Sequence, residues 1–183
     1  MKQLESTLPG VVLLELDVFG DHRGRFMETY RRERYLPFGI ALDFVQDNYS
    51  SSQKGTLRGL HYQLTKPQGK LVWVTRGEVF DVAVDIRRGS PTFGKWFGSI
   101  LSEANHRQMY VPPGFAHGFV VLSESADFLY KCTEVYDPKD ERSIRWDDPD
   151  LAIQWPIEGT PTLSARDREA SPLGTADLPE YVP

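Results

Sequence analysis

Cysteine and long apolar runs are scarce in this sequence, and their scarcity excludes several classes of protein. Cys132 is the only cysteine, which excludes an intramolecular disulfide framework and any zinc site built from several cysteines. The apolar stretch at residues 11–14 ends at Glu15 and is far too short for a signal peptide or a membrane helix. We therefore expect a soluble, cytoplasmic protein without a membrane partner.

Positive charge is also in short supply. The chain carries 21 lysines and arginines against 26 aspartates and glutamates, a net charge of −5. Binding along a nucleic acid requires a net basic face, so we expect no nucleic-acid partner. A local basic pocket for a single phosphate group remains compatible with this balance.

Helical periodicity is rare, and most apolar residues alternate with a period of two. In residues 79–86, the side chains at 80, 82, 84 and 86 form the one apolar face of a strand. Similar patterns predict strands at residues 11–17, 24–30, 44–50, 56–63, 70–75, 93–101, 107–111, 117–122 and 127–133. Short helices are expected at residues 31–36 and 163–169, where Ser164 and Asp167 have capping-box spacing.

The strands and the chain length define the expected fold. About ten short strands separated by turns are typical of an all-β sandwich or jelly-roll barrel, here with a few short helices. A length of 183 residues fits one domain, since domains average about 150 residues. We expect a single jelly-roll domain over residues 1–183. Its last dozen residues, rich in proline and without periodicity, are expected to form a surface tail.

Two of the four histidines lie where a functional site could form. His22 and His106 stand in polar turns typical of surface residues, whereas His61 and His117 lie in predicted strands. The Pro-x-Gly-x-x-His pattern that ends at His117 matches half of the metal motif of cupin barrels, a jelly-roll class. The other half fails, because neither a second histidine nor a carboxylate follows His61 closely. A first-row metal takes about three protein ligands, so we expect a cupin-like jelly roll without a metal.

Acid–base chemistry without a metal is the alternative use of such a site. It requires a base with a pKa near neutrality, an acid on the opposite face of the substrate, and a positive group for developing charge. His61 is the natural base, Tyr130 a proton donor, Lys70 an oxyanion stabiliser, and Asp167 a partner that orients His61. Structural explanations are also open: Lys70 as an exposed strand charge, Tyr130 as a core aromatic residue, and Asp167 as a helix cap only.

Arginines beside glycines are a further signal. Arg23–Gly24 and Arg58–Gly59 combine a bidentate phosphate ligand with a residue that lets a ligand approach the backbone. Arg58 and His61 are three residues apart, so a regular strand would place them on opposite faces. If both serve one site, a bulge near Gly59 must redirect one of them.

Long, ordered stretches of the chain closely resemble the dTDP-4-dehydrorhamnose 3,5-epimerase family. The resemblance extends from about residue 9 to 173, and its motifs lie at residues 19–28, 46–50, 54–63, 70–72, 81–85, 89–94, 112–119 and 163–167. It implies a jelly-roll homodimer that inverts C3 and C5 of dTDP-4-dehydro-6-deoxy-D-glucose. The product would be dTDP-4-dehydro-L-rhamnose, an intermediate of dTDP-L-rhamnose biosynthesis, made without a cofactor or metal.

The resemblance also implies a role for each candidate residue. His61 would remove a proton with Asp167 paired to it, Lys70 would stabilise the enolate oxygen, and Tyr130 would return a proton from the opposite face. Where the family binds its dTDP-sugar substrate, this chain has Arg23, Glu28, Gln46, Asn48, Arg58, His117, Glu141 and Arg166, with Tyr136 placed to stack on thymine. Arg166 stands where many relatives carry lysine.

Three other functions remain open at this stage. A related enzyme could epimerise one carbon only, or act as a ketoisomerase on another 4-keto deoxysugar nucleotide. A cupin that binds a sugar or nucleotide without catalysis would have the pocket but would not need the acid–base residues. A metalloenzyme would require a ligand set that the sequence does not provide.

Overall fold

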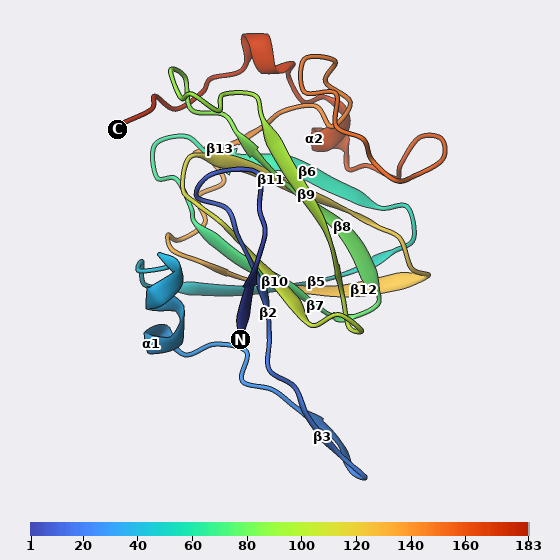
Figure 1. Ribbon diagram of the computed structural model, residues 1–183. Helices are drawn as coiled ribbons and strands as arrows, with labels where there is room; N and C mark the ends of the chain where they lie inside the picture. Colours follow the sequence, from blue (N-terminus) through green and yellow to red (C-terminus); the bar gives the residue numbers. More distant parts are fainter. Residues whose placement is uncertain (183) are drawn as a thin grey trace.

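The computed structural model describes residues 1–182, and two antiparallel sheets stacked as a sandwich dominate it (Figure 1). The all-β fold with a few short helices is therefore confirmed. The six-stranded sheet consists, in spatial order, of β1 (Lys2–Leu4), β2 (Val12–Glu15), β10 (Arg107–Val111), β7 (Lys70–Arg76), β12 (Ser125–Cys132) and β5 (Gln46–Gln53). The five-stranded sheet consists of β13 (Glu141–Ser143), β6 (Leu57–Gln63), β11 (Phe115–Val121), β8 (Glu78–Asp85) and β9 (Trp96–Ser102).

The core between the sheets follows from the alternation of the strands. Val72 and Phe128 of the six-stranded sheet pack with Ala83 and Phe119 of the five-stranded sheet in one buried cluster. The prediction of a single apolar face for residues 79–86 is wrong, because β8 is buried on both sides. The predicted apolar face, with Val82 and Val84, packs against the C-terminal part of the chain. The other face, with Val79 and Ala83, lies in the core between the sheets.

Short helices close the outer face of the six-stranded sheet. Helix α1 (Arg32–Tyr35) and the 3-10 helix η1 (Leu36–Phe38) lie beside β2 and β7, where Tyr35 packs with Leu14 and Leu71. No helix within residues 1–182 has the length and apolar character needed to cross a membrane.

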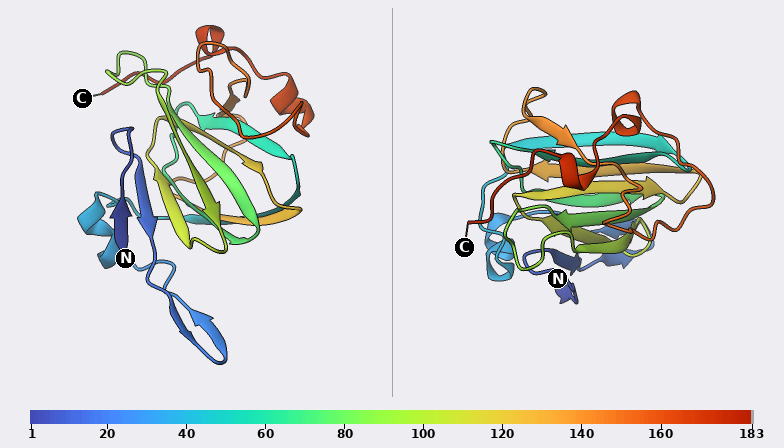
Figure 2. Two further views of the ribbon diagram at one scale, coloured as in Figure 1. Left: turned by 45° about the vertical axis from the view of Figure 1, so that its right-hand side comes forward. Right: turned by 90° about the horizontal axis from the view of Figure 1, so that it is seen from above.

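The C-terminal segment crosses the outer face of the five-stranded sheet (Figure 2). It contains α2 (Ala165–Arg168) and the 3-10 helix η2 (Leu173–Thr175). Leu173, Ala176 and Leu178 are buried there against Val82 and Val84 of β8. The prediction that the last dozen residues form a surface tail is therefore wrong. Its apolar residues follow neither a strand nor a helix period, so periodicity did not reveal that they are buried.

A hairpin projects away from the sandwich (Figure 1). It consists of β3 (Phe19–Asp21) and β4 (Gly24–Phe26), so the strand predicted at 24–30 ends early. Phe19 is 64% exposed and Phe26 is 70% exposed. Two large aromatic side chains this exposed mark a surface that fits a binding partner.

Candidate active site

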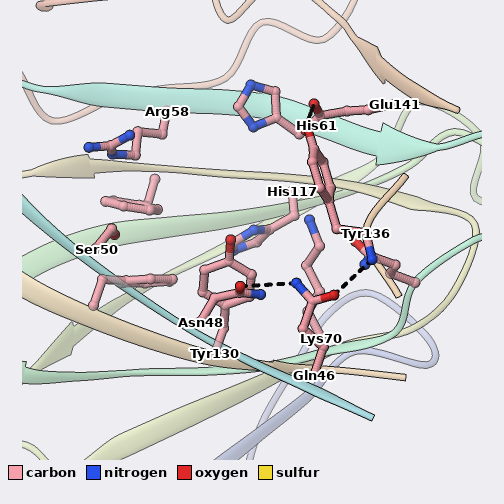
Figure 3. Close-up of a pocket in the computed structure, with 13 residues that line it drawn as sticks. Gln46, Asn48, Ser50, Arg58, His61, Lys70, His117, Tyr130, Tyr136 and Glu141 are labelled. Carbon is pink, nitrogen blue, oxygen red and sulfur yellow. Dashed lines mark hydrogen bonds between the residues drawn. The ribbon is translucent and has the colours of Figure 1, made fainter. Parts of the chain in front are cut away.

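A cavity of about 350 Å³ opens between the two sheets and brings most of the predicted site residues together (Figure 3). The six-stranded sheet contributes Gln46, Asn48, Ser50, Lys70, Phe128 and Tyr130. The five-stranded sheet contributes Arg58, His61, His117, Phe119 and Glu141, and loops add Gln68 and Tyr136. Residues far apart in the sequence thus face one space because their strands lie in opposed sheets.

His61 is held by a buried carboxylate. Its Nε2 lies 2.5 Å from Oδ1 of Asp167, whose side chain is 3% exposed. Burial by itself would raise the pKa of Asp167, but its hydrogen bonds to His61 and Ser164 lower that pKa below the ordinary value. Asp167 is therefore ionised at neutral pH and fixes the orientation of the imidazole, which leaves Nδ1 available to a ligand.

Asp167 has its capping role as well. The Ser164 hydroxyl accepts a hydrogen bond from the backbone N–H of Asp167 at 3.1 Å and donates to its carboxylate at 2.9 Å. The predicted capping-box contact from Ser164 is thus confirmed. The same contact fixes the carboxylate that pairs with His61, so Asp167 both takes part in the helix cap and holds the imidazole.

An irregularity of β6 at Gly59 allows Arg58 and His61 to face the same cavity. The pairing of β6 with β11 shifts register between His117 and Phe119, opposite Gly59, and both Arg58 and His61 face the cavity. The irregularity expected near Gly59 is confirmed. Gly59 has φ +116°, and a Cβ there would lie 2.6 Å from the carbonyl oxygen of His117. Only glycine fits this conformation and this approach of the two strands.

Lys70 and Tyr130 face the cavity from the six-stranded sheet. The Lys70 ammonium lies 6.0 Å from the centre of the Tyr130 ring. Burial raises the pKa of Tyr130 to about 12, so its phenol keeps its proton at neutral pH. Burial lowers the pKa of Lys70, whereas the nearby acidic groups Cys132, Glu141 and Asp81 oppose that change. Lys70 is therefore a cavity residue, and its interpretation as an exposed strand charge is wrong.

A second histidine–carboxylate pair was missed in the sequence. The Nε2 of His117 lies 2.9 Å from both carboxylate oxygens of Asp81, which is fully buried. Burial raises the pKa of Asp81, while His117 and Lys70 act in the opposite direction. One sequence signal was available: Asp81 stands two residues before Ala83 on β8, so both side chains lie on the same interior face of the strand. Among residues 1–182, no group of three or more His, Cys, Asp or Glu side chains is arranged to hold a metal ion.

Tyr136 and Glu141 form the other end of the cavity. The Tyr136 hydroxyl donates to Oε2 of Glu141 at 2.8 Å, and the guanidinium of Arg166 contacts the same carboxylate. Gln46 accepts a hydrogen bond from the Tyr136 backbone N–H at 2.8 Å and donates to Asn48 at 3.0 Å. Arg166, although it does not line the cavity, therefore supports its rim.

Besides Arg166, two further predicted binding residues lie outside the cavity of their own chain. Arg23 sits at the tip of the projecting hairpin, where it pairs with Asp21 and is 79% exposed. Glu28 follows that hairpin and pairs with Arg31 and Arg34. Within one chain, therefore, these two side chains do not contribute to the cavity formed between the sheets.

Comparison with known proteins gives consistent results for sequence and structure. A family model described as dTDP-4-dehydrorhamnose 3,5-epimerase matches residues 5–175. The dTDP-4-dehydrorhamnose 3,5-epimerase of Pseudomonas aeruginosa is 55% identical over 178 residues, which cover 97% of this chain and 98% of the relative.

Two solved structures share the fold over nearly their whole length. A dTDP-6-deoxy-D-glucose-3,5-epimerase of Legionella pneumophila, in complex with dTDP-4-keto-L-rhamnose, has a TM-score of 0.97 and 52% identity, with 100% of this chain and 99% of that chain covered. A 3'-monoepimerase of Streptomyces bikiniensis, in complex with dTDP-quinovose, has a TM-score of 0.90 and 38% identity, with coverages of 96% and 91%. With a full-length sequence match, a shared fold and a family model that spans most of its residues, the chain belongs to the dTDP-4-dehydrorhamnose 3,5-epimerase family.

Proposed function

We propose that this protein epimerises dTDP-4-dehydro-6-deoxy-D-glucose at C3 and C5 to give dTDP-4-dehydro-L-rhamnose, a step of dTDP-L-rhamnose biosynthesis. One observation carries the proposal. His61 enters the cavity from the five-stranded sheet and Tyr130 enters from the six-stranded sheet. A sugar bound between them meets a base on one face and an acid on the other, which is the arrangement that inversion of a carbon requires.

The chemistry follows from the C4 ketone of the substrate. Protons on C3 and C5 are acidic because the electron pair left by their removal moves onto the C4 oxygen as an enolate. His61, oriented by Asp167, takes the proton, and the Lys70 ammonium stabilises the enolate oxygen. Tyr130 then gives a proton to the opposite face of the same carbon. Removal and return of a proton involve no net oxidation, so the proposed reaction needs no redox cofactor and no metal.

The rest of the cavity suits the nucleotide part of the substrate. In this proposal, Tyr136 stacks on the thymine ring, and Arg58 and Arg166 supply positive charge to the diphosphate. The other residues proposed to contact the dTDP-sugar are Gln46, Asn48, His117 and Glu141. A charged, water-soluble substrate of this kind favours the expected cytoplasmic location.

Arg23 and Glu28 are proposed to complete the cavity of a second copy of the chain. The projecting hairpin that bears Arg23 exposes Phe19 and Phe26, and burying this apolar area against a partner would stabilise a homodimer. Each subunit would then provide a guanidinium to the diphosphate bound by the other. Gel filtration with light scattering should give twice the monomer mass, and deletion of residues 19–26 should give the monomer.

A single-carbon epimerase or a ketoisomerase is the second candidate. The specific observation in its favour is the 3'-monoepimerase of Streptomyces bikiniensis, whose fold matches this chain with a TM-score of 0.90. Incubation with dTDP-4-dehydro-6-deoxy-D-glucose in D2O, followed by NMR, separates the candidates. Deuterium at both C3 and C5, with an L-configured product trapped by a reductase, supports the double epimerase. Deuterium at one carbon supports the second candidate, and no exchange at either carbon contradicts both.

Two substitutions test the residue roles. His61→Ala should abolish exchange because the base is lost, whereas Tyr130→Phe should still exchange deuterium but form little epimerised product. His106→Ala and Tyr110→Phe are the matched controls, since both residues lie outside the cavity lining, and they should keep normal turnover. Normal turnover in folded His61→Ala would refute the proposed base.

A further inference from the structure

The loop that carries Tyr136 is held by side-chain amides. It connects β12 to β13 over residues 133–140 and includes no strand. Tyr136 itself is 44% exposed, so little packing holds it in place. An exposed aromatic residue on a loop normally samples several conformations, and each ordered residue costs about 1–2 kcal/mol of backbone entropy. The order of this loop therefore depends on its hydrogen bonds.

Gln63 binds the loop on both sides of Tyr136. Its Nε2 donates to the carbonyl oxygen of Val135 at 3.3 Å, and its Oε1 accepts from the backbone N–H of Asp137 at 2.7 Å. Nε2 also donates a hydrogen bond to the carbonyl oxygen of Lys66 at 2.8 Å, which fixes the orientation of the Gln63 amide. One side chain thus satisfies a backbone acceptor before Tyr136 and a backbone donor after it.

Two more glutamines extend the same pattern. The Nε2 of Gln68 donates to the carbonyl oxygen of Glu134 at 2.8 Å, and Oε1 of Gln46 accepts from the Tyr136 N–H at 2.8 Å. With Gln63, they bind backbone groups of every residue from 134 to 137. We call Gln46, Gln63 and Gln68 the glutamine clamp.

Gln63 differs from the other two because it does not line the cavity. Its side chain is 3% exposed, whereas Gln46 and Gln68 reach the space where a ligand binds. It also stands two residues after His61 on β6, which places both side chains on one face of the strand. The position of Tyr136 is thereby tied to the strand that carries the proposed base.

We propose that Gln63 is a positioning residue that holds Tyr136 over the nucleotide end of the cavity and sets the affinity for a pyrimidine nucleoside diphosphate. This inference rests on the proposed function, in which Tyr136 contacts the base. Gln63 acts through Val135 and Asp137 and takes no part in proton transfer. Its loss therefore weakens binding of the nucleotide and leaves the chemistry at His61 and Tyr130 intact once substrate is bound.

The test measures dTDP binding by isothermal titration calorimetry together with turnover. Gln63→Met keeps the side-chain length but removes the amide, and it should raise the Kd for dTDP and the KM about tenfold or more, with kcat within about twofold of wild type. Gln63→Asn keeps a polar group in the buried position but cannot reach the loop. The Gln63→Asn variant should also raise Kd and KM. It allows the proposal to be tested even if the methionine variant does not fold.

A matched control comes from another amide that holds a turn. Asn105 accepts from the backbone N–H groups of Ser102 and Arg107, each at 3.1 Å, and donates to the carbonyl oxygen of Ile100 at 2.9 Å. It does not line the cavity. Asn105→Leu should lower the thermal stability, as Gln63→Met does, while the Kd for dTDP stays within about twofold of the wild-type value.

A double-mutant cycle with Tyr136→Ala separates positioning from a general structural role. If Gln63 acts through Tyr136, Gln63→Met should change the Kd for dTDP by less than about twofold in the Tyr136→Ala background. Equal effects of Gln63→Met in both backgrounds, or a wild-type Kd in the folded single variants, would overturn the proposal. Because dTDP binding does not need turnover, failure of the epimerase reaction in wild type would leave this test standing.

Discussion

Replacement of Gly59 by alanine would place a methyl group 2.6 Å from the carbonyl oxygen of His117 and 2.7 Å from Cα of Gly118. Both neighbours are backbone atoms of β11, so no side chain can rotate away to make room. The backbone at Gly59 also has φ +116°, a conformation that residues with a Cβ avoid. Alanine is therefore expected to push β6 and β11 apart at the point between Arg58 and His61.

The size of the effect follows from two costs. An unfavourable φ for a residue with a Cβ costs about 1–3 kcal/mol, and overpacking a rigid site costs about 1–3 kcal/mol more. Together they give a loss of about 4 kcal/mol in the free energy of unfolding, or about 8–16 °C in Tm for a chain of this size. The turnover of the protein that remains folded should also fall, because His61 is displaced from Asp167.

Gly55→Ala is the matched control for this prediction. Gly55 has φ +76° in the turn just before β6, and a Cβ there would meet nothing within 4 Å. The Gly55→Ala variant should lose only the cost of a positive φ for a residue with a Cβ, about 1–2 kcal/mol in the free energy of unfolding. Thermal and urea unfolding of both variants give the comparison. Equal destabilisation by the two substitutions would show that the close approach of Gly59 to His117 and Gly118 contributes nothing.

Three further predictions concern the carboxylates. Hydrogen bonds from Arg87 and from two hydroxyls overcome burial and lower the pKa of Asp85 to about 2. Asp85 should therefore stabilise the fold by about 1–2 kcal/mol above pH 4 and lose this contribution as the pH falls toward 2. The stability difference between wild type and Asp85→Asn in urea should shrink in that window. Asp81→Asn removes a charge that raises the pKa of Lys70. The alkaline limb of the pH dependence of kcat should therefore move to lower pH. An alkaline limb at the wild-type pH would contradict this prediction. Asp167→Asn should lower kcat at least about 100-fold by loss of the correct histidine orientation, with dTDP affinity retained in calorimetry.

Strand alternation and the family motifs predicted much of the fold and the cavity. The predicted strand at residues 107–111 coincides with β10, and His61, Lys70 and Tyr130 meet in one cavity. Alternation succeeds here because each strand must bury one face between the sheets. The strand irregularity at Gly59 was also predictable, since Arg58 and His61 could share a site only through an irregular strand.

Other features depend on contacts that no local pattern records. Asp81 lies in an apolar strand, and its partner His117 comes from a different strand. Gln63 gains its role from a loop more than seventy positions later in the chain, where it binds Val135 and Asp137. Long-range pairs of this kind follow from the topology, so residue type and spacing alone could not identify them.

The location of Asp167 in the chain also decides when a newly made molecule can become active. All strands of the two sheets have been synthesised once Ser143 is added, but α2 and the buried residues up to Leu178 come later. The carboxylate that contacts His61 therefore lies in a part of the chain that is made after the last strand. His61 and Asp167 can pair only when the C-terminal segment lies against the five-stranded sheet, so the proposed base and its carboxylate come together only after residues beyond the last strand have been made and packed.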